Sequence, residues 1–168
     1  MPLANSKLYL SKVADVPEKT WAYLAGLIDG DGSIGIYRNS SISKTKHYTQ
    51  GFRRQHKLVI GINSHNVLEQ IQAKVHLGKV RTYQYVNKPP KLYHITIHFL
   101  DFSPNEIRVI LPNIIPHLIL KKELAEIVLK SLNVIENERR TERQHMLKDI
   151  DEEFHYAFLR SKNNEPYS

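Results

Sequence analysis

Apolar residues recur along the chain with two different periods, which predicts a mixture of helices and strands. From about residue 17 to 29 they lie three or four positions apart, as on one face of a helix, and Pro17 and Glu18 supply a helix start. The apolar face of this first predicted helix consists of Trp21, Leu24, Ala25 and Ile28. A second stripe consists of Ala22, Gly26 and Asp29 and has little bulk.

Four strands are predicted in two pairs, because apolar and polar residues alternate over residues 34–39, 54–63, 79–86 and 92–99. In the first pair the alternating apolar residues are Ile34, Ile36, Leu58, Ile60 and Ile62. In the second pair, one face of the third strand carries Lys79, Arg81, Tyr83 and Tyr85. One face of the fourth strand carries Tyr93, Ile95, Ile97 and Phe99, and its opposite face carries Leu92, His94, Thr96 and His98. The pattern predicts a sheet that is apolar beneath and polar, basic and aromatic above, with an exposed loop over residues 40–52.

Helical periodicity returns between and after the strand pairs. One helix is expected over residues 65–78 with Gly78 as its stop, and another opens at the capping box of Ser103 and Glu106 and ends at Pro112. Two more are expected from about Lys121 and from about Thr141. The order is αββαββα with a C-terminal helical extension, an α+β class. We expect one domain over residues 1–168, with its core at about 15–136 and the extension at about 137–168.

Composition and charge favour a polyanionic partner. The 168 residues include 24 Lys and Arg against 17 Asp and Glu, so the formal net charge is +7 and the pI is about 9.5. The absence of cysteine excludes disulfides and thiolate metal sites. No segment reaches the roughly 18 apolar residues of a membrane span, so we expect an intracellular protein without a membrane partner or secretion signal.

An acidic pair, Asp29 and Asp31, follows the first predicted helix in the segment LIDGDGS, and four interpretations compete for it. Asp-Gly is a common turn dipeptide. A calcium loop of the EF-hand type fails, because Ile34 and Ser40 stand where Gly and Glu are needed. Acid–base hydrolysis of a sugar leaves the basic sheet face unexplained. A hard-metal site for phosphodiester chemistry accounts for both the acids and the bases.

Asp29 lies at the predicted C-terminus of a helix, where the helix dipole makes an acid unfavourable by about 0.3 to 1 kcal/mol. A positive or hydrogen-bonding group should therefore compensate it. A metal ion held by Asp31 and the Gly30 carbonyl is one such group, and a local cap is the alternative.

The nine residues LAGLIDGDG, Leu24 to Gly32, differ from the LAGLIDADG motif only at Gly30, and the chain resembles the LAGLIDADG homing endonucleases. The resemblance covers most of the chain, since αββαββα is the core of that family. Relatives with one motif dimerise, and this chain has one. The resemblance therefore implies a homodimer whose motif helices meet through Ala22, Gly26 and Asp29.

For the chemistry, the resemblance implies that Asp31 is the principal catalytic residue and metal ligand, with the Gly30 carbonyl as a further oxygen ligand. Lys121 matches the basic residue that the family places beside the scissile phosphate. Oxygen ligands suit Mg²⁺, with Mn²⁺ as a substitute. The resemblance implies double-stranded DNA as the partner, and we expect a pseudopalindromic site of about 20 bp.

DNA contacts are expected from the polar sheet face and the ends of its strands. The residues assigned to this contact are Tyr37, Asn39, Arg53, Gln55, Lys57, Gly61, Asn63, Lys79, Arg81, Tyr83, Tyr85, His94 and Thr96. His94 and His98 share a strand face and could suggest zinc, but a groove-lining role is favoured because a third ligand is lacking. The C-terminal extension is a solvated helix over a small core or a contact to flanking DNA.

The resulting hypothesis is a metal-dependent, site-specific DNA endonuclease that acts as a homodimer and is encoded in an intron. Two alternatives share the fold. One is an RNA-splicing maturase, and the other is a DNA-binding regulator without cleavage. Both acids and Lys121 are retained, which favours the enzyme.

Overall fold

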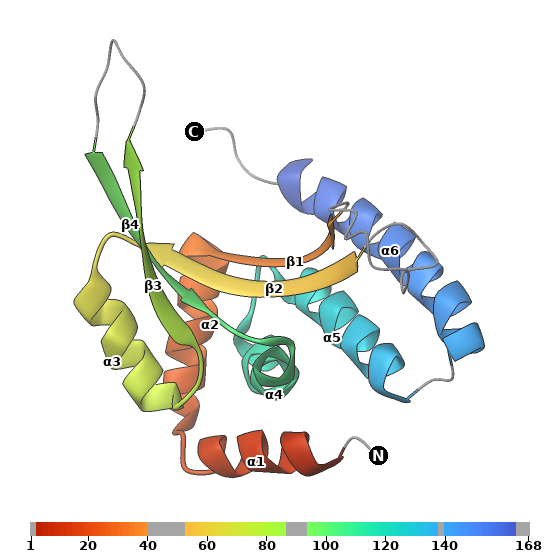
Figure 1. Cartoon of the computed structure of the whole chain (residues 1–168), viewed down its shortest axis with the longest axis horizontal. Coiled ribbons are helices and arrows are strands. Elements are labelled where there is room, and N and C mark those ends of the chain that lie inside the picture. Colours follow the sequence, from red (N-terminus) through yellow and green to blue (C-terminus); the bar gives the residue numbers. More distant parts are fainter. Residues whose placement is uncertain (1–2, 40–52, 87–93, 138–139, 164–168) are drawn as a thin grey trace.

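The computed structural model of the chain describes residues 3–39, 53–86, 94–137 and 140–163 (Figure 1). The elements are α1 (Leu3–Val13), α2 (Glu18–Asp31), β1 (Gly32–Asn39), β2 (Arg53–Ile62), α3 (His65–Val75), β3 (Lys79–Val86), β4 (His94–Asp101), α4 (Pro104–Ile114), the 3₁₀ turn η1 (Ile115–His117), α5 (Lys122–Asn137) and α6 (Arg140–Asn163). The predicted α+β class and the αββαββα order are confirmed. No described helix is long and apolar enough to cross a membrane.

The strands form one antiparallel sheet in the order β1-β2-β4-β3. The two hairpins meet only where Val59–Ile62 of β2 pairs with residues 98–101 of β4, so they diverge on either side of this short seam. Helices α2, α4 and α5 lie beneath the sheet, and β3 and β4 rise away from them (Figure 1). The opposite face of the sheet, which we call the open face, begins directly after the C-terminus of α2.

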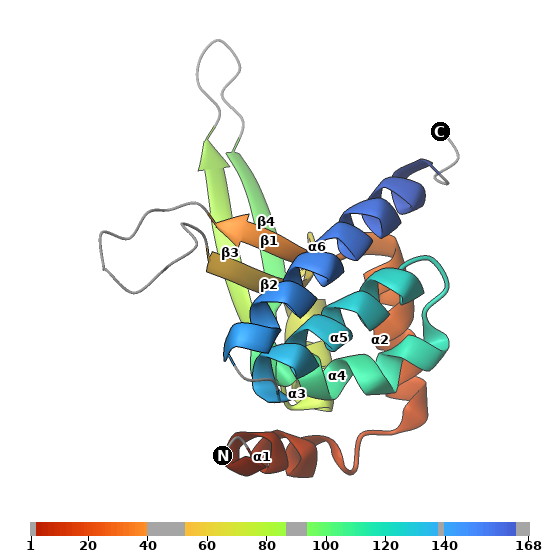
Figure 2. The same cartoon turned by 90° about the vertical axis from the view of Figure 1, so that its right-hand side faces the viewer.

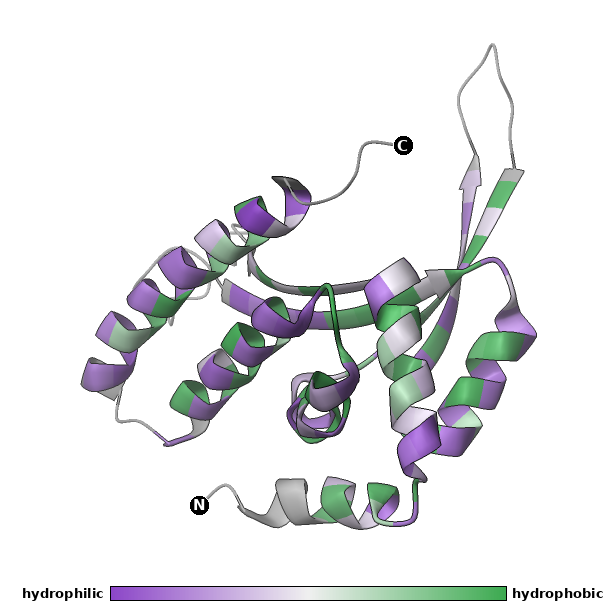
Figure 3. Ribbon diagram, turned by 180° about the vertical axis from the view of Figure 1, so that it is seen from behind, coloured by the Kyte–Doolittle hydropathy of each residue, from purple (hydrophilic) through white to green (hydrophobic). Residues whose placement is uncertain are grey.

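The core lies between the sheet and the helices beneath it. Leu24, Ala25 and Ile28 of α2 are fully buried against Ile60 of β2 and its neighbours, so the predicted apolar face of this helix is confirmed. Burial of a leucine or isoleucine side chain such as Leu24 or Ile28 contributes about 1.5 to 3 kcal/mol. Figure 3 shows the chain from behind, with the helical side that includes α2 towards the viewer and each residue coloured by its hydropathy.

Helix α1 was not predicted from the sequence. It packs beside α4 at the end of the molecule away from the sheet (Figure 1), and its last residue, Val13, is buried. Leu8 and Leu10 instead point outward, with 56% and 54% of their surfaces exposed. The apolar residues of α1 therefore do not form one clean stripe, which removes the periodic signal.

Three predicted helix ends were wrong. Helix α2 continues through Asp31, and α3 ends at Val75 because His76 takes the left-handed conformation, with φ of 57°. Pro112 lies inside α4, which runs on to Ile114. Proline lacks one N–H, but it leaves the donors of later residues intact, so a helix can pass through it where tertiary packing holds both sides. The capping box of Ser103 and Glu106 is confirmed.

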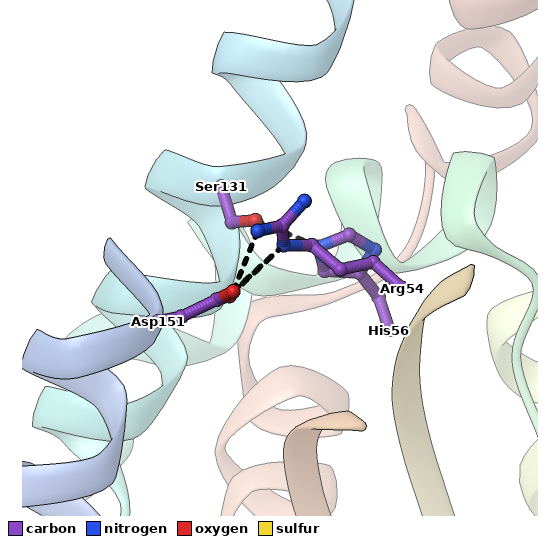
Figure 4. A network of polar contacts seen from close by, with 4 residues as sticks. All are labelled: Arg54, His56, Ser131 and Asp151. Carbon is purple, nitrogen blue, oxygen red and sulfur yellow. Dashed lines mark hydrogen bonds and ion pairs between the residues drawn. The ribbon is translucent and has the colours of Figure 1, made fainter. Parts of the chain in front are cut away.

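Helix α6 runs diagonally across α5 beside the sheet (Figure 2) and closes a second, smaller core. Leu147 and Ile150 are buried there as expected, whereas Phe158 is 38% exposed. Polar contacts join α6 and α5 to the underside of β2 (Figure 4). Arg54 donates to both carboxylate oxygens of Asp151, from Nε to Oδ1 at 2.9 Å and to Oδ2 at 3.1 Å, and from Nη2 to Oδ2 at 2.6 Å.

Next to this ion pair, Nε2 of His56 lies 2.8 Å from the hydroxyl of Ser131, and both residues are buried. Burial, with the nearby Arg54 charge as a smaller cause, lowers the pKa of His56 from 6.5 to about 4. The imidazole is therefore neutral at pH 7. Arg54 and His56 point into the protein and Gln55 and Lys57 face outward, which agrees with the predicted alternation of β2. The partners Asp151 and Ser131 were not predicted.

Candidate active site

The acidic motif forms the junction between α2 and β1. Asp31 is the last residue of α2 and is exposed, and the N–H of Gly32 closes the helix by donating to the Ile28 carbonyl. A Cβ on Gly32 would lie 2.6 Å from Cα of Ile28, so a side chain cannot fit without moving the backbone. The chain consequently passes from the helix into the open face with the Asp31 carboxylate at the edge of both.

Asp29 has a different environment from Asp31. It is partly buried, and its carboxylate accepts backbone N–H bonds from Ile119 at 2.7 Å, Leu120 at 3.2 Å and Lys121 at 2.9 Å. These donors lie just before α5. The expectation that hydrogen-bonding groups compensate this acid is thus confirmed. The predicted contact of Asp29 with a second subunit stays a prediction, although its carboxylate is bound to its own chain.

Lys121 approaches the same helix end from the other side. Its Nζ donates to the carbonyl of Ile28 at 2.8 Å and to the carbonyl of Asp29 at 2.6 Å. Carbonyls in the last turn of a helix lack intrahelical donors and carry partial negative charge, so an ammonium group is favourable there. The structure therefore brings Lys121 to the motif from a distant part of the sequence, and its place beside a scissile phosphate stays a prediction.

The small stripe on α2 faces away from the core. Ala22 and Gly26 are exposed, as is Gly30 one turn further on, and a Cβ built on either glycine meets no atom within 4 Å. Tyr23, next to the stripe, is 54% exposed. Nothing within the described part of the chain covers this face.

The donor set suits a hard cation but is small. Within the described ranges no group of three or more His, Cys, Asp or Glu residues could hold a metal ion. The zinc alternative also lacks support, because Nδ1 of His98 lies 2.9 Å from the Thr82 hydroxyl and its ring packs edge-on against His65. Asp31 and the Gly30 carbonyl are oxygen donors, which Mg²⁺ prefers.

Strand register places most of the assigned DNA-contacting residues on the open face. Tyr37 is opposite Gln55, Lys57 is opposite Gly35, and Gly61 is opposite Phe99. Exposed residues on this face or directly after its strands are Tyr37, Gln55, Lys57, Asn63, Lys79, Arg81, Tyr83 and Tyr85. The side chains of Asn39, Arg53 and His94 lie outside the described part of the structure. The location was predictable, and the contacts with DNA stay a prediction.

The prediction for the faces of β4 was wrong. Ile97 is opposite Tyr83 and Ile95 is opposite Tyr85, so these isoleucines and Phe99 lie on the open face. Thr96 and His98 lie on the other face, the one that carries the buried Leu100. From Leu100 back towards His94, the β3–β4 hairpin rises clear of the helices (Figure 1). Neither of its faces is consistently buried there, so the alternation of apolar and polar residues no longer indicates which face is inward.

Aromatic rings and one ion pair organise the open face. Nζ of Lys57 lies 5.1 Å from the ring centroid of Tyr37, and the Phe99 ring packs against Tyr83 at 5.6 Å. Gly61 leaves room for Phe99, since a Cβ there would lie 2.9 Å from that ring. Nε of Arg81 bonds to Oδ2 of Asp101 at 3.1 Å.

Asp101 was not singled out from the sequence, because its place among cations depends on the register of β3 and β4. Where β2 separates from β4, a cavity of about 690 Å³ opens, and its lining includes Lys57, Lys79, Arg81 and Asp101. The lining holds four Lys or Arg residues and two acids, and this excess of positive charge suits the phosphates of a nucleic acid backbone.

Comparison with known proteins identifies one family. The sequence matches the model described as LAGLIDADG endonuclease over residues 24–118, more than half of the chain. No curated protein sequence gives a significant match.

Among solved structures the fold is similar to the homing endonuclease I-CvuI in complex with its target in the presence of 2 mM Ca, with a TM-score of 0.63 and 21% identity over 84% of this chain and 82% of that chain. It is similar to the archaeal intron-encoded homing endonuclease I-Vdi141I complexed with DNA, with a TM-score of 0.65 and 17% identity over 89% and 87%. The LAGLIDADG meganuclease I-CpaMI bound to uncleaved DNA gives a TM-score of 0.54 and 23% identity, over 76% of this chain and only 39% of that chain.

Proposed function

The chain belongs to the LAGLIDADG endonuclease family, and from that premise we propose that it is a metal-dependent homing endonuclease that cuts double-stranded DNA at a specific site as a homodimer. The observation that carries this proposal is the position of Asp31. It is exposed at the tip of α2, where the uncovered stripe of that helix meets the open face of the sheet. A site that lies between two copies of the chain and next to the basic residues of the open face suits the cutting of both strands of a duplex.

The homodimer follows from the single motif and the exposed stripe. Ala22, Gly26 and Gly30 have no bulk, so a second α2 can approach at backbone distance and bring two Asp31 carboxylates together near a twofold axis. The coverage of relatives supports this arrangement, since the chain spans 87% of I-Vdi141I but 39% of I-CpaMI. I-Vdi141I is described as intron-encoded, and we propose the same origin for this chain.

The open face positions the substrate. Lys57 and Lys79 supply charge to phosphates, and Arg81 has the donor geometry to read guanine in the major groove. Tyr37, Tyr83 and Tyr85 add apolar surface with a polar tip. In a symmetric dimer the two open faces would follow a pseudopalindromic site of about 20 bp.

Asp31 and the Gly30 carbonyl would hold Mg²⁺, or Mn²⁺ in its place, and the second copy's acid and the phosphate oxygens would supply the ligands that one chain lacks. When bound, the ion would lower the pKa of an attacking water and stabilise charge on the scissile phosphate. Lys121 adds a fixed positive charge at the helix tip, where negative charge develops on that phosphate. Because so few protein ligands are present, we expect weak Mg²⁺ binding without DNA, which calorimetry on the free protein can measure.

The decisive experiment is a cleavage assay on a plasmid library with Mg²⁺, performed on the natural chain and on Asp31→Asn. We expect the natural chain to cut a small set of sites. The variant should lose at least a hundredfold of the rate while its DNA affinity in Ca²⁺ stays within about twofold, because the open face is unchanged. A natural chain that binds DNA without cutting would instead support a regulator, and preference for folded intron RNA would support a maturase.

A further inference from the structure

Asp29 and Lys121 form a reciprocal set of hydrogen bonds that connects the motif to the start of α5. We call this set of contacts the motif clamp. It comprises the Asp29 carboxylate with the N–H groups of residues 119–121, and the Lys121 ammonium with the carbonyls of Ile28 and Asp29. Its two halves are 90 or more residues apart in the sequence, so only the tertiary fold brings them together.

The first half of the motif clamp fixes the segment that leads into α5. The Lys121 carbonyl accepts the first helical bond, from the N–H of Ala125 at 3.0 Å, so Lys121 occupies the N-cap position. Lysine cannot accept a hydrogen bond there, unlike the residues that N-caps prefer. The Asp29 carboxylate instead binds the N–H groups of residues 119–121, directly before α5, and lies where the positive end of the α5 dipole favours an anion.

The second half neutralises the end of α2. That end carries the negative pole of the helix dipole together with Asp29 and Asp31, which is an unfavourable concentration of negative charge. The Lys121 ammonium is held directly against it by two bonds of 2.8 and 2.6 Å. Asp29 fixes the backbone of Lys121, and the backbone of Lys121 determines where its ammonium can reach.

We propose that Asp29 is a positioning residue for the cleavage reaction, acting by holding the Lys121 ammonium in a fixed relation to the Asp31 carboxylate and the Gly30 carbonyl. This inference rests on the proposed function. The geometric demand is strict, since misplacement of a catalytic group by about 1 Å can lower a rate by about a hundredfold. The two motif acids then have separate tasks, with Asp31 facing the substrate and Asp29 facing the protein.

The test is a double-mutant cycle of Asp29→Asn, Lys121→Met and both together, measured by single-turnover cleavage. The amide that Asp29→Asn introduces would keep one acceptor but replace the other with a donor, which opposes the N–H groups. We expect Asp29→Asn to cut at least tenfold more slowly with unchanged DNA affinity in Ca²⁺. The double variant should cleave no more slowly than Lys121→Met alone, because both substitutions act through the same ammonium group of Lys121. Asp29→Glu should recover part of the rate.

A readout without cleavage separates this inference from the proposed function. Reductive methylation followed by peptide mass spectrometry should modify Lys121 more slowly than its exposed neighbour Lys122, and Asp29→Asn should raise the Lys121 rate several-fold. Asp149→Asn, at an exposed acid of α6, is the matched control and should leave it unchanged. Wild-type cleavage by Asp29→Asn, multiplicative losses in the cycle or unchanged labelling would each overturn the positioning role. A natural chain that never cuts would overturn the function, while the labelling would still decide whether the motif clamp exists.

Discussion

At the scale of single residues, identical side chains have different tasks because their surroundings differ. Asp29 and Asp31 are two positions apart, yet the first accepts three N–H bonds and the second is exposed at the helix tip. Likewise, Arg54 and His56 point into the protein, whereas Gln55 and Lys57 between and beside them face outward. A β-strand alternates its faces, so residue type alone does not determine which face a basic residue occupies.

His56 makes stability depend on pH. The groups around it are Arg54 on its own strand, Asp151 on α6, Arg108 on α4 and the Ser131 hydroxyl on α5. The pKa is about 4 in the folded protein and 6.5 in the unfolded chain, so between these values the unfolded state binds a proton that the folded state does not. The contribution of neutral His56 is therefore complete above pH 6.5 and is lost as the pH falls towards 4.

We predict that between pH 7 and pH 5 the natural chain loses about 2 kcal/mol more unfolding free energy than His56→Gln, in which the amide can still bond to Ser131. Urea denaturation at the two pH values measures this difference. His145→Gln, at an exposed histidine of α6, serves as the control and should follow the natural chain. Parallel pH profiles for His56→Gln and the natural chain would contradict the assignment.

At the scale of elements, α2 serves two surfaces. Its apolar face is buried beneath the sheet, and its small stripe is uncovered. Within one chain the glycine at position 26 has no packing requirement, because a Cβ there meets no atom within 4 Å. Glycine costs a helix roughly 1 kcal/mol relative to alanine, so an exposed glycine without a local purpose suggests that something approaches from outside.

The Gly26→Leu variant should therefore fold but fail to dimerise, because the leucine side chain would keep the two α2 helices apart. We expect a monomer at concentrations where the natural chain is a dimer, with unfolding free energy per chain equal or higher because leucine is the better helix former. Sedimentation equilibrium measures the state. Ala73→Leu, at an exposed small residue of α3, is the matched control and should remain dimeric. A dimeric Gly26→Leu would place the contact elsewhere.

At the scale of the whole molecule, the open face gathers cations from two hairpins. The chain carries +7, and Lys57 of β2 lies on the same face as Lys79 and Arg81 of β3, while α1 lies at the end of the molecule away from the sheet (Figure 1). Helix α6 extends the sheet sideways and is held by the Arg54–Asp151 pair, whose side chains are only 13% and 6% exposed. The cations of the open face therefore lie on one surface of a sheet that packed helices support from beneath.

Salt dependence should map that surface. Lys57→Gln and Lys79→Gln should each reduce the slope of log affinity against log salt by about 0.9, or about 1.8 for two symmetric subunits, while leaving the preferred sequence unchanged. Lys12→Gln, on α1 at the far end of the molecule, should not alter the slope. Fluorescence anisotropy on a cleaved or Ca²⁺-held site provides the measurement. Equal slopes for Lys12→Gln and Lys57→Gln would show that DNA does not lie on the open face.

The sequence by itself determined the α+β class, the element order, the core face of α2 and the location of the acidic motif. These features depend on local periodicity, on capping residues and on one nine-residue motif, and each of these signals lies within a short contiguous stretch of the sequence. It also indicated that Asp29 needed a compensating partner, because the helix dipole is a local property.

Only the tertiary structure decided which groups supply that compensation, since the N–H groups of residues 119–121 and the Lys121 ammonium come from 90 or more residues away. It also decided that Ile95 and Ile97 lie on the open face, because beyond the short seam between β2 and β4 the hairpin leaves the core and alternation loses its meaning. Helix α1, the passage of α4 through Pro112 and the partners of Arg54 and His56 have the same origin. Each depends on contacts between distant segments, which no local pattern encodes.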